Sequence, residues 1–512
     1  MKETFRQSMS WLHTWSGLLL GWVLFAIFVT GTATYFRWEI TRWMQPEIRQ
    51  TGTPYDAARA AWQRLDSVAA DSPQWFVELP DGRAAATTLF WRHAGPGRRF
   101  GRETLDSATG RPVVARDTRG GEFFYRFHFQ LQLPHPWGRY LAGVAAMFMF
   151  VALISGVITH RKMFADFFTF RPGRAPLRAW LDFHNVTAVL ALPFYFMISY
   201  SALVIFMTMY MPWGGRVLAE SASSARAGRP APTASAWVAP ADFAPMLATA
   251  QAAWGDGQRA LKRIEVANRG TDKCTVTLTR ADGPKISLNA REQLRFDGVS
   301  GQLLDPPVTA AGPGTAVHDA LYGLHLARFA GPALRWSFFT MGLLGSALVA
   351  TGLVMWTMKR RARGGAGLAL VERLNITAIA GLPVAIAALF WANRLLPVDL
   401  ADRGDWEVYG FLCAWGFMLM HPLVRPVMAA WHEQLRLGAA LFLLLPLLDA
   451  LTAGPCLRAA WQHRDWAHLG FDAAMLGCGL LLHFAANRVH RRLRLAATAA
   501  APAASAGSTV HA

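Results

Sequence analysis

Long apolar stretches alternate with polar segments along the chain. About eight stretches are long enough to cross the roughly 30 Å hydrocarbon core of a bilayer, which takes about 20 helical residues. They lie at 14–36, 139–160, 183–209, 336–357, 374–396, 408–424, 436–452 and 468–487. A cleaved signal peptide is an alternative for the first stretch, because Lys2 and Arg6 precede it, but its length favours a span. The pattern predicts an all-α membrane bundle of about eight transmembrane helices.

Two longer polar segments interrupt this bundle and share one internal order. Each begins with an amphipathic helical pattern and continues with alternating, strand-like runs. The helix and strands are expected at 55–70, 74–79, 85–91 and 102–105 in the first segment, and at 243–254, 274–279, 285–289 and 293–296 in the second. Each series ends in an Asp-to-Gly turn, Asp106 to Gly110 and Asp297 to Gly301, where Gly supplies a positive φ. The sequence therefore predicts two small α+β domains.

The repeat continues into the apolar stretches. His13 near the start of the first span matches His184 near the start of the third, and His128 before the second matches His325 before the fourth. We therefore expect an internal two-fold repeat in the first four spans, with a pseudo-two-fold axis along the membrane normal. The last four spans show no such duplication and are predicted to form an appended bundle.

The expected domain organisation follows from these patterns. It comprises a transmembrane helix (1–36), an α+β domain (37–138), two transmembrane helices with a basic loop (139–209), a second α+β domain (210–335), a transmembrane helix (336–363), a four-helix membrane bundle (364–495) and a disordered tail (496–512). A linker rich in Gly, Ser, Ala and Pro at 214–240 enters the second α+β domain.

Charge sets the expected orientation. The chain has 51 Lys and Arg against 33 Asp and Glu, a formal net charge of +18. The densest basic runs directly follow apolar stretches, at 161–162, 359–363 and 488–494, and the loop 397–407 is acidic. The positive-inside rule then predicts that both termini are cytoplasmic and that the two α+β domains lie on the opposite side. Because the positive-inside rule accounts for the positions of the basic residues, we expect no nucleic acid partner.

The histidines are the candidate functional residues. A pair straddling a two-fold axis can supply both axial ligands to one haem, so His13 with His184 and His128 with His325 predict two haem irons stacked across the membrane. His160, at the inner end of the second span, is the alternative inner ligand. The four cysteines are scattered and no CxxCH motif is present, so the expected groups are non-covalent haem b.

Other chemistries are less well supported by the sequence. Zinc stays open as an alternative because Asp182 and Asp319 lie beside histidines of the repeat. Histidines without a repeat partner are expected to form ordinary hydrogen bonds; these are His421, His432, His483 and His490. No nucleotide-binding glycine motif, nucleophile elbow or HExxH motif is found. The chain therefore has no visible machinery for nucleotide binding or for serine- or zinc-dependent hydrolysis.

Four motifs together resemble one known family. They are WLHTWSGLLLG from Trp11, SGVITHRK from Ser155 followed by FFTFR from Phe167, LDFHN from Leu181, and Leu324-His325 before a span. Over about residues 1–363 the chain is similar to the PepSY-associated transmembrane helix family. The resemblance implies a multi-pass protein of the bacterial inner membrane with periplasmic PepSY-like domains. Members are iron-regulated or act as di-haem ferric-siderophore reductases, and the four repeat histidines fall where such haem ligands are expected.

The resulting expectation is a membrane-bound oxidoreductase of the b-type cytochrome class. It would take electrons from quinol or a cytoplasmic reductase and pass them to a periplasmic acceptor, with a ferric siderophore as the expected substrate. One alternative is a haem-free PepSY membrane protein that regulates a periplasmic protease or senses a ligand. A transporter subunit is a third possibility, although no pair of broken spans marks a midplane site.

Overall fold

The computed structural model describes most of the chain. The described residues are 4–48, 52–93, 100–160, 163–168, 176–211, 213, 237–257, 260–281, 286, 292–305, 313–362, 364–365, 367–452, 460–462 and 464–500. They form two compact units. Unit 1 combines Met1–Met44, Asp117–Phe196 and Phe339–Ala512, and unit 2 combines Gln45–Arg116 and Met197–Phe338.

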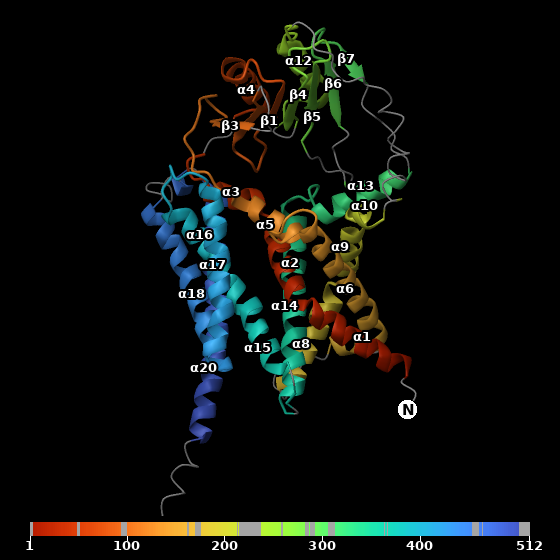
Figure 1. Cartoon of the computed structure of the whole chain (residues 1–512), viewed down its shortest axis with the longest axis vertical. Helices are drawn as coiled ribbons and strands as arrows, with labels where there is room; N and C mark the ends of the chain where they lie inside the picture. Colours follow the sequence, from red (N-terminus) through yellow and green to blue (C-terminus); the bar gives the residue numbers. More distant parts are fainter. Residues whose placement is uncertain are drawn as a thin grey trace, which may run out of the picture. The chain divides into compact units, whose positions relative to one another are not determined.

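Apolar helices dominate the structure, as the hydropathy pattern predicts (Figure 1). Among the described residues, six helices are long and apolar enough to cross a membrane, and two bent helix pairs raise the number to eight if each pair is one span. The helices concerned are α1 (Phe5–Leu19), α2 (Gly21–Thr34), α6 (Trp137–Thr159), α8 (Pro176–Leu190), α9 (Leu192–Ile205), α14 (Pro332–Arg361), α15 (Leu368–Ile376), α16 (Leu382–Leu395), α17 (Arg403–Val424), α18 (Val427–Thr452) and α20 (Trp466–Ala500).

The first and third apolar stretches are bent, whereas the sequence pattern suggested continuous spans. The α1–α2 pair turns by 64° at Leu20, and the α8–α9 pair turns by 67° at Ala191. Hydropathy reports length and composition but carries no information on helix direction, so the bends are invisible in it. The bends divide each of these stretches, so that His13 lies on α1 and His184 on α8.

The C-terminal helices form a bundle whose apolar interior also contains buried ion pairs. A π-helical turn, η3 (Thr377–Gly381), joins α15 to α16 within one continuous apolar stretch. Two ion pairs are fully buried: Arg394 with Asp449 at 2.6 Å, and Arg403 with Glu407 at 2.6 Å. Charges are rare inside apolar bundles unless they are paired, and they often mark function.

Shorter helices complete the chain. They are α3 (Arg37–Met44), α4 (Pro54–Val68), α5 (Gly120–Gln130), α7 (Met163–Phe167), α10 (Met207–Tyr210), α12 (Phe243–Trp254) and α13 (Pro313–Leu326). Only α4 and α12 were expected from the sequence. Helix α5 buries Phe123, Phe124 and Phe127 in an aromatic cluster with Phe411 of α17. This packing ties the segment before the second span to the C-terminal bundle.

The described residues of unit 2 form a seven-stranded antiparallel sheet with strand order β3-β2-β1-β4-β5-β6-β7. The strands are β1 (Gln74–Glu78), β2 (Thr87–Arg92), β3 (Phe100–Leu105), β4 (Arg263–Ala267), β5 (Thr275–Thr279), β6 (Gln293–Asp297) and β7 (Leu303–Asp305). Strands from the two polar segments meet where β1 pairs with β4, Gln74 opposite Ala267 and Glu78 opposite Arg263. The two series of strands therefore share one hydrogen-bonded sheet.

One hydrophobic core joins the sheet to α4 and α12. Alternation buries Trp75 and Val77 of β1, and Ile264 and Val266 of β4, against these helices. Helix α4 begins at a Thr53 N-cap with Pro54 in its first turn, both favoured starting signals. Every second side chain of the strands and the apolar face of the helices are therefore buried in the same core layer.

The two predicted Asp-to-Gly turns have the same hydrogen bonds. Asp106 Oδ1 accepts from the Thr109 backbone N–H at 2.7 Å, and Asp297 Oδ1 accepts from that of Ser300 at 2.8 Å. Gly110 has φ +68° and Gly301 has φ +73°, the left-handed conformation expected of these glycines.

The strand predictions are uneven. The runs at 74–79, 85–91 and 102–105 correspond to β1, β2 and β3, and those at 274–279 and 293–296 correspond to β5 and β6. The strand expected at 285–289 lies outside the described residues apart from residue 286, and most of the linker 214–240 and the tail from 501 also lie outside them. Strands β4 and β7 were not anticipated.

Candidate functional site

His13 and His184 face each other within unit 1. Their ring centres are 6.4 Å apart and the rings are nearly perpendicular, at 79°. His13 lies on α1 and His184 on α8. The structure thus brings together the two residues that the repeat paired as the inner ligands.

Both rings are held through Nδ1. His13 Nδ1 lies 2.8 Å from the Ala152 carbonyl oxygen, and His184 Nδ1 lies 2.9 Å from the Thr351 hydroxyl. A carbonyl only accepts, and the Thr351 hydroxyl uses its own proton on the Leu348 carbonyl at 2.9 Å, so each Nδ1 is a donor. A neutral imidazole that donates through Nδ1 has its lone pair on Nε2, the arrangement of a metal-ligating histidine.

Two glycines make room for this pair. A Cβ added at Gly156 of α6 would lie 3.1 Å from Cε1 of His13, and one added at Gly352 of α14 would lie 3.5 Å from Cε1 of His184. The contact at Gly156 would be tight, whereas the one at Gly352 is an ordinary van der Waals distance.

The pair has the dimensions that a shared metal ion requires. Two imidazoles bound on opposite sides of one metal at about 2 Å each have ring centres roughly 6 Å apart. The observed 6.4 Å agrees with that separation. At this spacing, Nε2 of His13 and Nε2 of His184 are the atoms that would hold a haem iron.

His128 lies on α5 and contacts the first span. Its Nδ1 donates to the Ile27 carbonyl oxygen of α2 at 2.8 Å. The ring packs over Gly31, where any added Cβ would collide with it. Helix α5 and these contacts hold His128 in one orientation.

His325 lies on α13 and is held in the same manner within unit 2. Its Nδ1 donates to the Ser201 hydroxyl at 2.9 Å, while that hydroxyl donates to the Met197 carbonyl at 2.6 Å. His128 belongs to unit 1 and His325 to unit 2, and the pairing of these two histidines stays a prediction.

His160, the alternative inner ligand, lies at the end of a helix. It is the C-cap of α6, and its backbone N–H donates to the Gly156 carbonyl at 3.0 Å. It therefore ends the helix one turn beyond the glycine that contacts His13.

The histidines without a repeat partner make local contacts. His421 pairs with Glu433 at 2.9 Å, His432 stacks on His490 with centroids 4.9 Å apart, and His483 hydrogen-bonds Asn487 at 2.9 Å. These are local side-chain contacts, and the ordinary hydrogen-bonding roles expected from the sequence stay a prediction.

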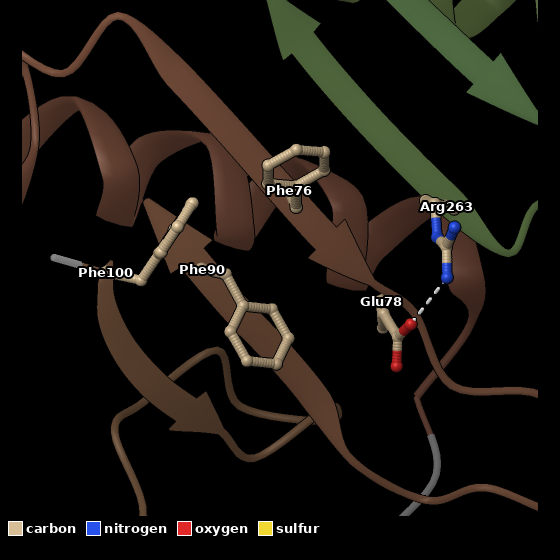
Figure 2. Close-up of a pocket in the computed structure, with 5 residues that line it drawn as sticks. All are labelled: Phe76, Glu78, Phe90, Phe100 and Arg263. Carbon is tan, nitrogen blue, oxygen red and sulfur yellow. Dashed lines mark hydrogen bonds and ion pairs between the residues drawn. The ribbon is translucent and has the colours of Figure 1, made fainter. Parts of the chain in front are cut away.

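The exposed face of the sheet carries an aromatic hollow in unit 2 (Figure 2). It measures about 290 Å³ and is lined by Phe76, Glu78, Phe90, Phe100 and Arg263. Phe76 and Phe90 are opposite one another in the β1–β2 register, and Glu78 pairs with Arg263 at 2.7 Å. The hollow offers apolar contact and one ion pair, but none of the nitrogen or sulfur ligands that a haem iron needs.

A group of metal-type ligands in the C-terminal bundle was missed by the sequence analysis. Among the described residues, Asp449, His468 and Asp472 are buried and place their ligand atoms within 4.8 Å of one another. The sequence did contain an indication of this group. His468 and Asp472 are four residues apart, which places them on one face of a helix, and ionisable residues in apolar spans are often functional. The zinc alternative named Asp182 and Asp319, which do not belong to this group.

These features define a multi-pass membrane protein that also carries an antiparallel sheet. The model of the PepSY-associated TM region matches residues 10–359, and the chain belongs to this family. The chain is also 26% identical over 370 residues to an uncharacterized protein of Pseudomonas aeruginosa. The aligned region covers 67% of this chain and 89% of that relative. Helices α15 to α20 lie beyond the matched family region.

Proposed function

We propose that the protein is a di-haem b-type cytochrome of the bacterial inner membrane that reduces a periplasmic ferric siderophore. The observation that carries the proposal is the facing pair His13 and His184, with ring centres 6.4 Å apart. Each ring is tethered through Nδ1, which favours Nε2 as the iron ligand. The bound haem would supply one-electron transfer, and the protein would supply ligation and positioning.

The outer pair is proposed by the same chemistry. His128 and His325 each donate through Nδ1 to an oxygen of an apolar helix, Ile27 O and Ser201 Oγ respectively. All four histidines are held through Nδ1, as matching positions of a repeat would share, although the acceptor within each pair is a carbonyl for one histidine and a hydroxyl for the other. Two ligand pairs at opposite membrane faces would divide a crossing of about 30 Å, too long for a single electron transfer, into shorter steps.

The direction of transfer follows from the predicted orientation. Basic residues at the ends of apolar stretches favour cytoplasmic termini and a periplasmic sheet. The chain has no nucleotide-binding motif, so quinol or a cytoplasmic reductase is proposed as the electron donor. Periplasmic folded protein beside the outer pair is then the natural place for an acceptor.

A ferric siderophore fits the acceptor role on chemical grounds. Siderophores bind Fe(III) through hard oxygen donors, and adding one electron lowers the charge on iron and weakens every such bond. Reduction to Fe(II) therefore releases iron without breaking the ligand.

The visible spectrum of the purified full chain tests this function. We expect about two haem b per chain, removable by acid acetone and reducible by dithionite. Pre-reduced haem in oriented vesicles should be reoxidised by a membrane-impermeant ferric siderophore on the outer face only. A folded, colourless protein would exclude the cytochrome and favour a haem-free regulator of a protease. Reoxidation from the cytoplasmic side alone would reverse the direction, and no reoxidation would exclude the substrate class.

A further inference from the structure

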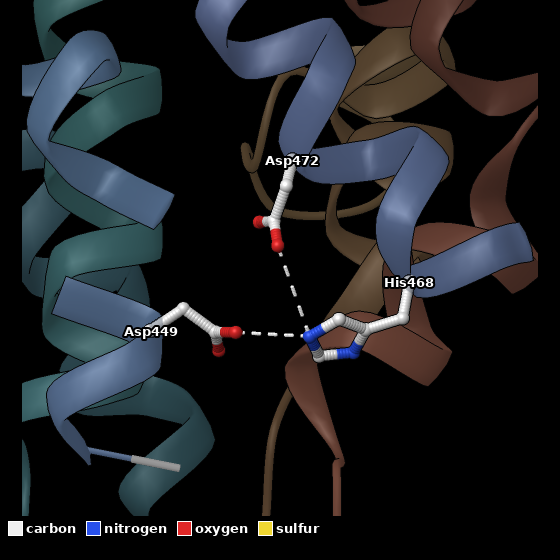
Figure 3. A group of neighbouring side chains, drawn as sticks. All are labelled: Asp449, His468 and Asp472. Carbon is white, nitrogen blue, oxygen red and sulfur yellow. Dashed lines mark hydrogen bonds and ion pairs between the residues drawn. The ribbon is translucent and has the colours of Figure 1, made fainter. Parts of the chain in front are cut away.

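Three ligand-bearing side chains converge inside the C-terminal bundle (Figure 3). Asp449 lies near the end of α18, and His468 and Asp472 lie one turn apart at the start of α20. Nε2 of His468 is 2.9 Å from Oδ2 of Asp449 and 3.9 Å from Oδ2 of Asp472. One nitrogen and two carboxylate oxygens thus face one point.

Each carboxylate is oriented by a second contact on its other oxygen. Arg394 Nε donates to Asp449 Oδ1 at 2.7 Å, and Trp43 Nε1 donates to Asp472 Oδ1 at 3.0 Å. Arg394 also lies over the Trp43 ring, 3.7 Å from its centre. Such outer contacts fix ligating carboxylates in metal sites. The second oxygen of Asp449 is hydrogen-bonded to Nε2 of His468 at 2.9 Å, and a cation bound by both atoms would replace the proton between them.

The Oδ2 atom of Asp472 is the independent sign of a missing ligand. It is buried and accepts no hydrogen bond within the part of the chain that the structure describes, and the Asp472 side chain is only 9% exposed. A buried carboxylate oxygen without a hydrogen-bond donor is costly, so a group that satisfies it is expected. The atom points toward His468 Nε2 rather than toward solvent.

The charges of the group leave room for a cation. Arg394 balances the charge of one carboxylate, and the other ionised carboxylate stays uncompensated when His468 is neutral. The nearby pair of Arg42 and Asp465 is balanced within itself at 3.0 Å. Imidazole and carboxylate together suit divalent transition metals such as Zn²⁺, Mn²⁺ or Fe²⁺, whereas Ca²⁺ and Mg²⁺ prefer oxygen alone.

We propose that Asp449, His468 and Asp472 form a binding site for a divalent transition-metal cation. The Nε2 lone pair of neutral His468 and one oxygen from each aspartate bind the ion, and Arg394 and Trp43 hold the two carboxylates in place. The site belongs to helices beyond the matched family region and does not depend on haem binding.

The test uses the full chain in detergent with Zn²⁺ and Mn²⁺ as probes, since haem iron contributes to neither signal. Titration calorimetry gives the affinity, and elemental analysis after gel filtration gives the bound metal per chain. We expect about one Zn²⁺ per chain at this site, and a loss of affinity of at least about tenfold in His468→Ala and Asp472→Asn. Asp472→Asn keeps the side-chain volume and an acceptor for Trp43, so it carries the test if His468→Ala fails to fold.

His421→Ala is the matched control, because that ring faces only one carboxylate, Glu433. It should bind metal like the unmodified chain. The proposal is overturned if the unmodified chain binds neither metal. It is also overturned if folded Asp472→Asn binds metal as tightly as the His421→Ala control.

Discussion

The rings of Trp62 and Phe243 stack face to face, with centroids 4.1 Å apart and planes 2° from parallel. Trp62 belongs to α4 and Phe243 to α12, the helices that open the two repeated polar segments. Trp62 also meets Trp75 of β1 edge-on at 5.3 Å. This contact joins the two helices above the shared sheet.

Replacing Trp62 should weaken unit 2. Trp62→Ala removes the stack and leaves a cavity, so we expect the free energy of unfolding to fall by about 2–4 kcal/mol. Pulse proteolysis of the full chain in increasing urea measures this. Val114→Ala is the control, because Val114 is 87% exposed. A Trp62 variant as stable as that control would show that the stack contributes little.

The inner histidines should each be needed for one haem. His13→Ala and His184→Ala should both lower haem content from about two to about one per chain, because five-coordinate iron is held weakly. His432→Ala, which removes a ring stacked on His490, should leave it unchanged. If the double variant of His13 and His184 keeps its full haem content and spin state, the pairing is wrong and His160 becomes the inner candidate.

The hydroxyl that holds His184 should tune haem binding. Thr351→Val keeps the side-chain shape but removes the acceptor for His184 Nδ1. Loss of such an outer contact should lower haem affinity by about 10–100-fold and change the low-spin EPR signal. Thr351→Ser should restore both properties. If Thr351→Val left the haem affinity and the EPR spectrum unchanged, the Thr351 hydroxyl would have no role in haem ligation.

Breaking the buried pair of Arg403 and Glu407 should be costly. Both side chains are 0% exposed, so Glu407→Gln leaves an uncompensated charge on Arg403 and should lower stability by about 3–5 kcal/mol. Thermal unfolding in detergent measures the change. Asp405→Asn is the control, since the Asp405–Arg119 pair is nearly half exposed and should contribute no more than about 1 kcal/mol. Equal effects of the two substitutions would contradict the prediction.

The Cys274 thiol should be unreactive in the folded protein. Burial raises the pKa of Cys274, and Asp297 raises it further against the opposing effect of Arg269. The reactive thiolate is therefore scarcer at every pH than in an exposed cysteine. Mass spectrometry after maleimide treatment at pH 7 should find Cys274 labelled in urea but not in the native chain. Equal labelling rates in urea and in the native chain would mean that unit 2 opens readily near the start of β5, which follows Cys274.

Local chemistry made part of the fold predictable. The turns ending at Gly110 and Gly301 depend on residues next to each other in sequence, and both have the expected conformation. Strand β4 was missed although Ile264 and Val266 alternate with polar neighbours. Its pairing with β1 brings together residues far apart in the sequence, and no short pattern encodes such a contact.

The candidate sites show the same limit. The matching positions of His13 and His184 in the repeat were enough to predict that these two histidines meet. Asp449, His468 and Asp472 have no repeat partner, and their convergence depends on how α18 packs against α20. Helix spacing placed two of the three on one face, but the third could come only from tertiary structure.

Strand β1 pairs with β4 in the antiparallel direction, so each half of the sheet covers the strand edge of the other half and protects it from aggregation. Each of these strands lies inside the sheet only because the other half is present. Removing either half would expose a row of backbone donors and acceptors together with the apolar side chains beneath it, a template for association with other chains.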